Sequence, residues 1–143
     1  MEIKFEVPGN PKALKRHRTV NIKTKTGKSF VTQYDPSKGT KNDFLALAAA
    51  NRPDEPFDCP LIVEMIFNFD RPKSHFRTGK FSNELKDNAP IYHTSAPDCD
   101  NLAKFVCDAL NGIFWKDDRV ISKLVVSKFY TSTPKTQITI RAL

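Results

Sequence analysis

The alternation of apolar and polar residues predicts two early strands in this chain. In residues 2–7 charged side chains alternate with apolar ones, and Pro8-Gly9-Asn10-Pro11 follows as a turn. A period of two is typical of a strand with one buried face. Residues 61–69 (LIVEMIFNF) are β-branched and aromatic, with polar residues only at 64 and 68. This composition predicts a second strand.

A helical period appears twice. Residues 41–51 (KNDFLALAAAN) are rich in alanine and leucine, which are strong helix formers. From Asn101 onward, apolar residues recur at the spacing i, i+3, i+4, i+7 and i+8, which is typical of an amphipathic helix. These residues are Leu102, Phe105, Val106, Ala109 and Leu110. The pair Asn111-Gly112 is a typical end for this helix.

The last third of the chain predicts two further strands, at 120–130 and 136–142, joined by a turn at 132–135. The simplest arrangement of two such strands is a hairpin. The C-terminal half therefore lacks the regular strand–helix alternation of a doubly wound sheet. We expect an α+β fold: one small domain over residues 1–143, with a mixed β-sheet, two main helices and long basic loops.

Two segments between these elements are strongly basic. Residues 12–28 have little apolar periodicity and indicate a solvated loop or ribbon, and residues 70–95 form a loop long enough to suggest a function. The formal net charge of the chain is +7, which favours polyanions, nucleic acid first among them, as partners. The candidate DNA-binding residues are Lys12, Lys15, Arg16, Arg18, Arg71, Lys73 and Arg77. The alternative is that these runs are ordinary solvated faces.

Other classes of protein fit the sequence poorly. No apolar run approaches the ~20 residues that span a bilayer, and the N-terminus lacks the order of a signal peptide. We expect a cytoplasmic protein without a membrane partner. The three cysteines, Cys59, Cys99 and Cys107, have no CxxC spacing and are interpreted as reduced thiols. His17, His75 and His93 share no metal-ligand spacing and are interpreted as solvated or phosphate-contacting.

An acidic pair precedes the second predicted helix. Asp98 and Asp100 lie two residues apart in APDCDNLAK, after Pro97. If this stretch is extended, both carboxylates point to the same side. Proline and cap-favouring residues favour a helix start at about Asp100, so the two acids would sit at the positive end of the helix.

A third acid can reach this pair. The predicted helix from 101 to 111 rises roughly 16 Å, at ~1.5 Å per residue. The six residues after Gly112 (IFWKDD) span roughly 20 Å when extended, so the chain can double back and bring Asp117 or Asp118 beside the pair. Three carboxylates make an all-oxygen metal site, which suits Mg²⁺ or Mn²⁺ rather than zinc. Spacing alone leaves both aspartates open.

Lys104 follows Asp100 by one helical turn and lies on the same face, where it could orient a phosphate. Each of these residues also has a structural interpretation. Acids before a helix are usually caps, and Lys104 could pair with Asp100 or Asp108. Asp117 could be a turn residue. Cys99 is rejected as a nucleophile because no histidine stands close to it in the sequence.

The stretch PDCDNLAKFVCDALNGIFWKDDRVI, Pro97 to Ile121, resembles the signature of the RusA-like Holliday junction resolvases: D-x-D-N-L-x-K, then D-A-L-N-G, then W-x-D-D before a strand. The N-terminal VPGNPKALKRHR is similar to the family's opening segment, more loosely. The resemblance implies a homodimeric, Mg²⁺-dependent endonuclease, often encoded by phages or prophages. Such an enzyme introduces paired nicks into four-way DNA junctions during recombination and repair.

Carried onto this sequence, the resemblance implies Asp98, Asp100 and Asp118 as catalytic and metal-binding acids, with Lys104 as the catalytic lysine. It thereby favours Asp118 over Asp117. One departure is Pro97, which stands where some relatives carry a DNA-binding arginine. The candidates to replace that arginine are Arg71, Lys73, His75 and Arg77. The competing hypotheses are a metal-dependent nuclease for flaps or other branched DNA and a non-catalytic DNA-binding protein.

Overall fold

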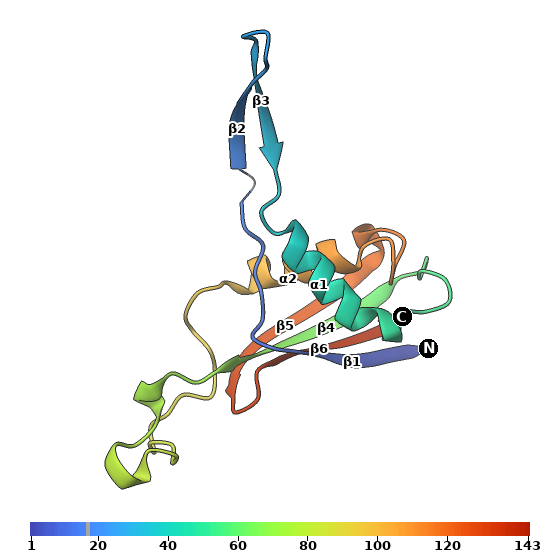
Figure 1. Ribbon diagram of the computed structural model, residues 1–143. Helices are drawn as coiled ribbons and strands as arrows, with labels where there is room; N and C mark the ends of the chain where they lie inside the picture. Colours follow the sequence, from blue (N-terminus) through green and yellow to red (C-terminus); the bar gives the residue numbers. More distant parts are fainter. Residues whose placement is uncertain (17) are drawn as a thin grey trace.

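The computed structural model describes residues 1–16 and 18–143 (Figure 1). His17 lies outside the described residues. The strands are β1 (Glu2–Pro8), β2 (Arg18–Lys23), β3 (Ser29–Tyr34), β4 (Leu61–Asp70), β5 (Ile121–Thr131) and β6 (Lys135–Ala142). The helices are α1 (Lys38–Ala48) and α2 (Cys99–Leu110), with short 3₁₀ turns η1 (Ala49–Asn51), η2 (Lys73–His75), η3 (Gly79–Phe81) and η4 (Asp118–Val120). Each predicted element is therefore present, with ends shifted by a few residues.

The main sheet has four strands in the order β1-β6-β4-β5. β4 pairs parallel to β5 and antiparallel to β6, so the sheet is mixed and the α+β prediction is confirmed. The predicted hairpin between the last two strands is wrong, because β4 lies between them. β4 carries the most buried side chains of any strand, and burial places such a strand in the interior of the sheet. A local turn signal carries no information about this long-range pairing.

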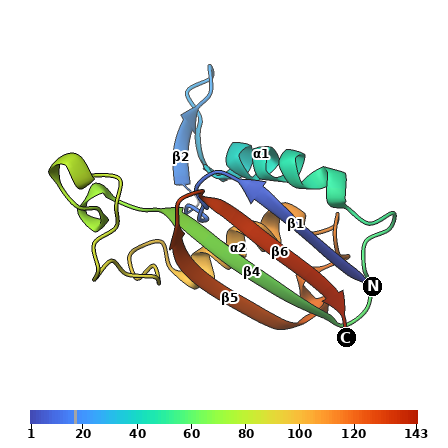
Figure 2. The same ribbon diagram turned by 90° about the horizontal axis from the view of Figure 1, so that it is seen from below.

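The core lies between the sheet and the helices. Inward side chains of β4, Leu61, Val63, Met65 and Phe67, are fully buried against the apolar face of α2. Phe44 of α1 meets Phe105 of α2 edge to face, with ring centroids 5.7 Å apart. Figure 2 shows α2 behind the four-stranded sheet. The amphipathic period predicted for α2 thus fixes one face in the core and leaves the other for solvent.

Two extensions leave this body. β2 and β3 pair antiparallel in a separate two-stranded ribbon that stands clear of the sheet (Figure 1). The long loop between β4 and α2 projects in another direction and contains η2 and η3. These extensions correspond to the two basic segments. In the described part of the chain, no helix is long and apolar enough to cross a membrane.

The long loop returns to the sheet along the end of β5. The His93 amide donates to the Lys128 carbonyl at 3.1 Å, and the Tyr130 amide donates to the Ile91 carbonyl at 2.9 Å. His93 is 8% exposed and stacks on Phe69 with ring centroids 3.9 Å apart. The interpretation of His93 as a solvated side chain is therefore wrong. Burial lowers its pKa, and the nearby Lys128 charge lowers it further.

Candidate active site

The boundary between loop and helix separates the two acids of the D-x-D pair. α2 begins at Cys99, so Asp98 is its N-cap, with extended backbone (φ −75°, ψ 155°), and Asp100 belongs to the first turn. The two residues therefore do not share one extended segment, because the helix starts one residue earlier than Asp100. Within the described chain, the Asp98 side chain makes no capping hydrogen bond to the helix. Its carboxylate is thus not used as a structural cap.

An open cavity of about 410 Å³ lies between α2 and the start of β5. Its lining residues are Asp100, Ala103, Lys104, Cys107, Asp108, Asp118, Ile121 and Leu124. Asp100, Lys104 and Asp108 follow one another at helical spacing, which places them on one face of α2. Asp118 comes from η4, after the chain has turned back along the helix. The structure therefore brings Asp100, Lys104 and Asp118 to one cavity, while Asp98 and Asp117 are outside its lining.

Asp118 is attached to the core. Its Oδ1 accepts a hydrogen bond of 2.7 Å from Nε1 of Trp115, which is fully buried. Burial raises the pKa of the Asp118 carboxyl, and the charges of Asp108 and Asp117 raise it further, although the Trp115 hydrogen bond opposes this. The ionised form of the Asp118 carboxyl is therefore disfavoured in this position. A cation bound beside it would stabilise the ionised form.

Asp117 has a different environment from its neighbour. It is the N-cap of η4, and its Oδ1 accepts a hydrogen bond of 3.0 Å from the Arg119 amide. Asp117 is thus a turn residue that caps η4. The choice of Asp118 as the third site acid stays a prediction, and the cavity and the η4 cap both favour it.

Lys104 is exposed on the cavity wall. The structural alternative for it was an ion pair with Asp100 or Asp108. Asp108 instead faces Lys41 of α1, with Oδ2 to Nζ at 3.7 Å, and Lys41 also pairs with Asp35. Among residues 1–16 and 18–143, no ion pair involves Lys104. Its ammonium group is available to a ligand.

The carboxylates of the cavity do not form a compact cluster. Within the described residues, no three His, Cys, Asp or Glu side chains gather closely enough to hold a metal ion. The donor set nevertheless fits a hard divalent cation, because carboxylates supply the oxygen ligands that Mg²⁺ and Mn²⁺ prefer. Cys107 adds no competing thiolate, since burial, with the charges of Asp118 and Asp108, raises its pKa to about 12. The metal assignment stays a prediction.

The first basic segment passes directly beside this site. The Leu14 amide donates to the Asn101 carbonyl at 3.3 Å, next to Asp100, and the Lys15 amide donates to Ser37 Oγ at 2.8 Å. The candidate DNA-binding residues of this segment, Lys12, Lys15, Arg16 and Arg18, are all exposed. Positive side chains are therefore anchored near the acidic cavity.

The basic residues of the second segment differ in whether their side chains contact other parts of the loop. Arg71 is half-buried, donates from Nη1 to the Pro90 carbonyl at 2.7 Å and lies 5.6 Å from the centroid of the Tyr130 ring. Arg77 pairs with Glu84 at 3.0 Å. Both contacts maintain the shape of the loop, whereas Lys73 is exposed. Their role in DNA binding stays a prediction.

Sequence reasoning missed one positively charged contact at the site. Lys128 of β5 donates from Nζ to the carbonyl oxygens of Ser95 and Pro97, both at 2.8 Å. Pro97 directly precedes Asp98, and Ser95 lies three residues before it. The available signal was a lysine at an inward position, since Lys128 is in register with the buried Phe67.

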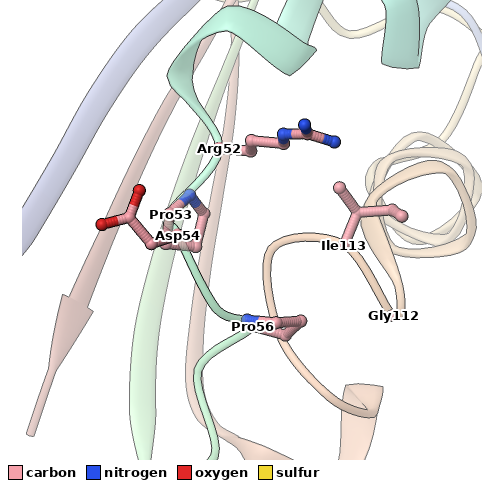
Figure 3. A pocket seen from close by; sticks show the side chains of 6 residues that line it. All are labelled: Arg52, Pro53, Asp54, Pro56, Gly112 and Ile113. Carbon is pink, nitrogen blue, oxygen red and sulfur yellow. The ribbon is translucent and has the colours of Figure 1, made fainter.

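A second cavity, of about 380 Å³, lies away from the acids (Figure 3). It is lined by residues that follow η1 and residues that follow α2: Arg52, Pro53, Asp54, Pro56, Gly112 and Ile113. Arg52 extends toward Ile113, while the Asp54 carboxylate points the other way (Figure 3). Its lining holds one arginine and one carboxylate that points away from it, without a second acid, which makes this cavity a poor candidate for metal-dependent phosphodiester chemistry.

Comparison with known proteins adds two findings. The family model described as endodeoxyribonuclease RusA matches residues 8–141. An uncharacterized protein of Bacillus subtilis (strain 168), YqaN, is 33% identical over 139 residues, which cover 97% of this chain and 95% of YqaN. The match thus includes the cavity, the ribbon and the long loop.

Proposed function

The chain belongs to the RusA endodeoxyribonuclease family, and on that premise we propose that it is a metal-dependent nuclease that resolves four-way DNA junctions. The observation that carries the proposal is the single cavity shared by Asp100, Lys104 and Asp118. Carboxylates, a lysine that pairs with no acid among the described residues and an adjacent basic segment are the parts that phosphodiester hydrolysis needs. The net charge of +7 suits a polyanionic substrate.

In this mechanism Asp100 and Asp118, which share the cavity, would hold Mg²⁺, for which Mn²⁺ could substitute, and Asp98 would join them as the family motif implies. The bound ion would supply an activated water and neutralise charge on the phosphodiester. Trp115 orients Asp118 through its hydrogen bond to Oδ1. Lys104 contacts the scissile phosphate and stabilises charge on the leaving oxygen. The exposed lysines and arginines near the root of the ribbon hold the flanking phosphates.

We further propose that the active form is a homodimer. A two-fold dimer presents two identical sites, and a four-way junction is itself nearly two-fold. Paired nicks at symmetric positions follow from this arrangement. Sedimentation of the purified protein with and without a junction tests the stoichiometry.

The decisive experiment uses an end-labelled four-way junction, incubated with Mg²⁺ or with chelator. Wild-type protein should produce paired nicks in the presence of Mg²⁺ and no nicks in the presence of chelator. Asp100→Asn and Asp118→Asn should lower the cleavage rate by about 100-fold or more, because each removes a site carboxylate. Asp54→Asn, an exposed acid at the second cavity, is the matched control and should cleave normally. Full activity of Asp118→Asn would rule out the proposed site.

Flaps, linear duplex and single strands belong in the same assay. A junction resolvase cleaves the four-way junction fastest and nicks it in pairs. Preferential cutting of flaps would reassign the substrate, and junction binding without nicking under any divalent ion would mean a non-catalytic protein.

A further inference from the structure

The β2–β3 ribbon has one apolar and one polar face. Residues paired directly across an antiparallel ribbon share a face, and so do alternate residues along each strand. The pairs on one face are Arg18 with Tyr34, Val20 with Thr32, and Ile22 with Phe30. The opposite face carries Thr19, Asn21 and Lys23 with Gln33, Val31 and Ser29. The ribbon therefore presents a stripe of aliphatic and aromatic side chains.

This apolar stripe is open to solvent. Phe30 is 50% exposed, Tyr34 45%, and Val20 and Ile22 39% each. The ribbon stands away from the four-stranded sheet (Figure 1). An isolated two-stranded ribbon is only marginally stable in water, and exposed apolar surface of this kind usually marks a contact with a partner.

Charge indicates which partner. Residues 12–34 contain no Asp or Glu, and their seven cationic side chains are Lys12, Lys15, Arg16, Arg18, Lys23, Lys25 and Lys28. A surface with charge of one sign attracts a polyanion and repels a second copy of itself. Nucleic acid combines negative charge with flat apolar bases, and the endodeoxyribonuclease family of the chain favours it over other polyanions.

The position of the ribbon agrees with this partner. Its root is tied to the first turn of α2 by the Leu14 to Asn101 hydrogen bond and to the start of α1 by the Lys15 to Ser37 bond. DNA that reaches Asp100 must therefore pass close to the base of the ribbon. A two-stranded β-ribbon is also thin enough to enter a major groove.

We propose that the β2–β3 ribbon is a DNA-binding arm that recognises branch points. Phe30 and Tyr34, with Val20 and Ile22, contact bases that are unstacked at the branch, while the lysines contact phosphates. This inference rests on the proposed branched-DNA substrate. It assigns part of the discrimination between branched and linear DNA to the arm rather than to the cavity.

The test is binding without cleavage, measured by fluorescence anisotropy in chelator with a labelled junction and a duplex of equal length. The double variant Phe30→Thr/Tyr34→Thr keeps β-branched residues in the strand. It should weaken junction binding by about fivefold or more and duplex binding by less than about twofold, since stacking on unpaired bases is lost. Val31→Thr, which removes a 63% exposed apolar side chain from the opposite face, is the matched control and should bind normally.

Equal loss on both substrates, or no loss, would overturn the role of the aromatic residues. A change in oligomeric state on sedimentation would mean that a second copy covers the face, which also overturns the proposal. These outcomes are separable from cleavage. If wild-type protein cuts no DNA but the junction-specific loss persists, the nuclease assignment fails and the arm stands. If junctions are cut and the double variant binds them normally, the arm fails alone.

A second, independent observation concerns Lys128. Its half-buried ammonium group makes two hydrogen bonds of 2.8 Å, to the carbonyls of Ser95 and Pro97. Hydrogen bonds from a charged donor are stronger than neutral ones, and two of them hold the backbone that leads into Asp98. The main chain of Lys128 holds the same segment through its carbonyl and the His93 amide.

We infer that Lys128 is a positioning residue that sets the direction of Asp98 at the start of α2. Lys128→Met removes both side-chain bonds at similar length, and Lys128→Arg keeps the charge. If the nuclease assignment is correct, Lys128→Met should lower kcat by about 10- to 100-fold with little change in junction affinity, as for other residues that orient metal ligands. Lys128→Arg should recover part of this loss.

Amide hydrogen exchange of residues 91–101 gives a readout that does not depend on activity. Exchange there should accelerate in Lys128→Met. It should stay normal in Lys123→Met, an exposed lysine on the opposite face of β5. Unchanged exchange in Lys128→Met would overturn the positioning role. Faster exchange with normal kcat would show that the segment is held but that its order does not matter for cleavage, which also overturns it.

Discussion

At the scale of single residues, the core holds one carboxyl of the candidate site, that of Asp118, and raises its pKa. Asp118 accepts a hydrogen bond from Trp115, a fully buried side chain, and this bond holds the carboxyl within reach of the charges of Asp108 and Asp117. Burial and these neighbours raise its pKa. The folded protein therefore binds a proton at Asp118 more tightly than the unfolded chain does.

The sign of the resulting stability effect follows from linkage. The ionised Asp118 carboxyl destabilises the fold, and this cost appears as the pH rises through the interval between its unfolded and its raised folded pKa. Asp118→Asn removes the charge and keeps an acceptor for Trp115. Without divalent ions, the variant should melt at or above the wild-type temperature at pH 8.

Scanning calorimetry across pH checks this prediction. The difference in melting temperature should shrink as the pH falls below the Asp118 pKa, because both proteins are then neutral at that position. A variant that is less stable than wild type at pH 8 would contradict the assignment of strain to the ionised carboxyl.

At the scale of elements, the two faces of α2 have different surroundings, since one packs in the core and the other borders the open cavity. Leu102, Phe105 and Val106 are buried in the core, whereas Asp100 and Lys104 line the open cavity. The same helical period that predicted the buried face thus also predicted that Asp100 and Lys104 remain exposed at the cavity.

Substitutions on the two faces should therefore have opposite consequences. Phe105→Ala should lower the free energy of unfolding by about 3–5 kcal/mol, because it leaves a cavity in the core. Lys104→Ala should change it by less than about 0.5 kcal/mol and still abolish most cleavage. Urea denaturation and junction cleavage measure the two effects, and a large destabilisation by Lys104→Ala would argue that this lysine is structural.

At the scale of the whole molecule, the protein combines a small acidic cavity with widely distributed positive charge. The formal net charge is +7, and the first basic segment is anchored beside the cavity. Binding should consequently be dominated by phosphate contacts and should be sensitive to salt.

The salt dependence can be measured as the slope of log Kd against log salt concentration. Each phosphate contact contributes about 0.9 to the slope with duplex DNA. The double variant Lys25→Ala/Lys28→Ala at the tip of the ribbon should reduce the slope by up to about 1.8 on junction and duplex alike. An unchanged slope would exclude the tip lysines as phosphate contacts.

The local features of this protein were determined by the sequence itself. Periods of two and of 3.6 residues predicted the strands and helices, because they report which side chains each element must bury. The spacing of Asp100 and Lys104 placed both on one face of α2, since that geometry is set within one helical turn. The two basic segments were evident from composition alone.

Only the tertiary structure decided which distant segments meet. The insertion of β4 between β5 and β6 depends on how completely each strand can be buried, and the turn between the last two strands carries no information about that. The placement of Asp118 and Asp100 at one cavity, the burial of His93 and the contact of Lys128 with Ser95 and Pro97 all follow from the return of the chain along α2 and β5. Such contacts join residues far apart in the sequence, so their energies appear only when the whole core packs.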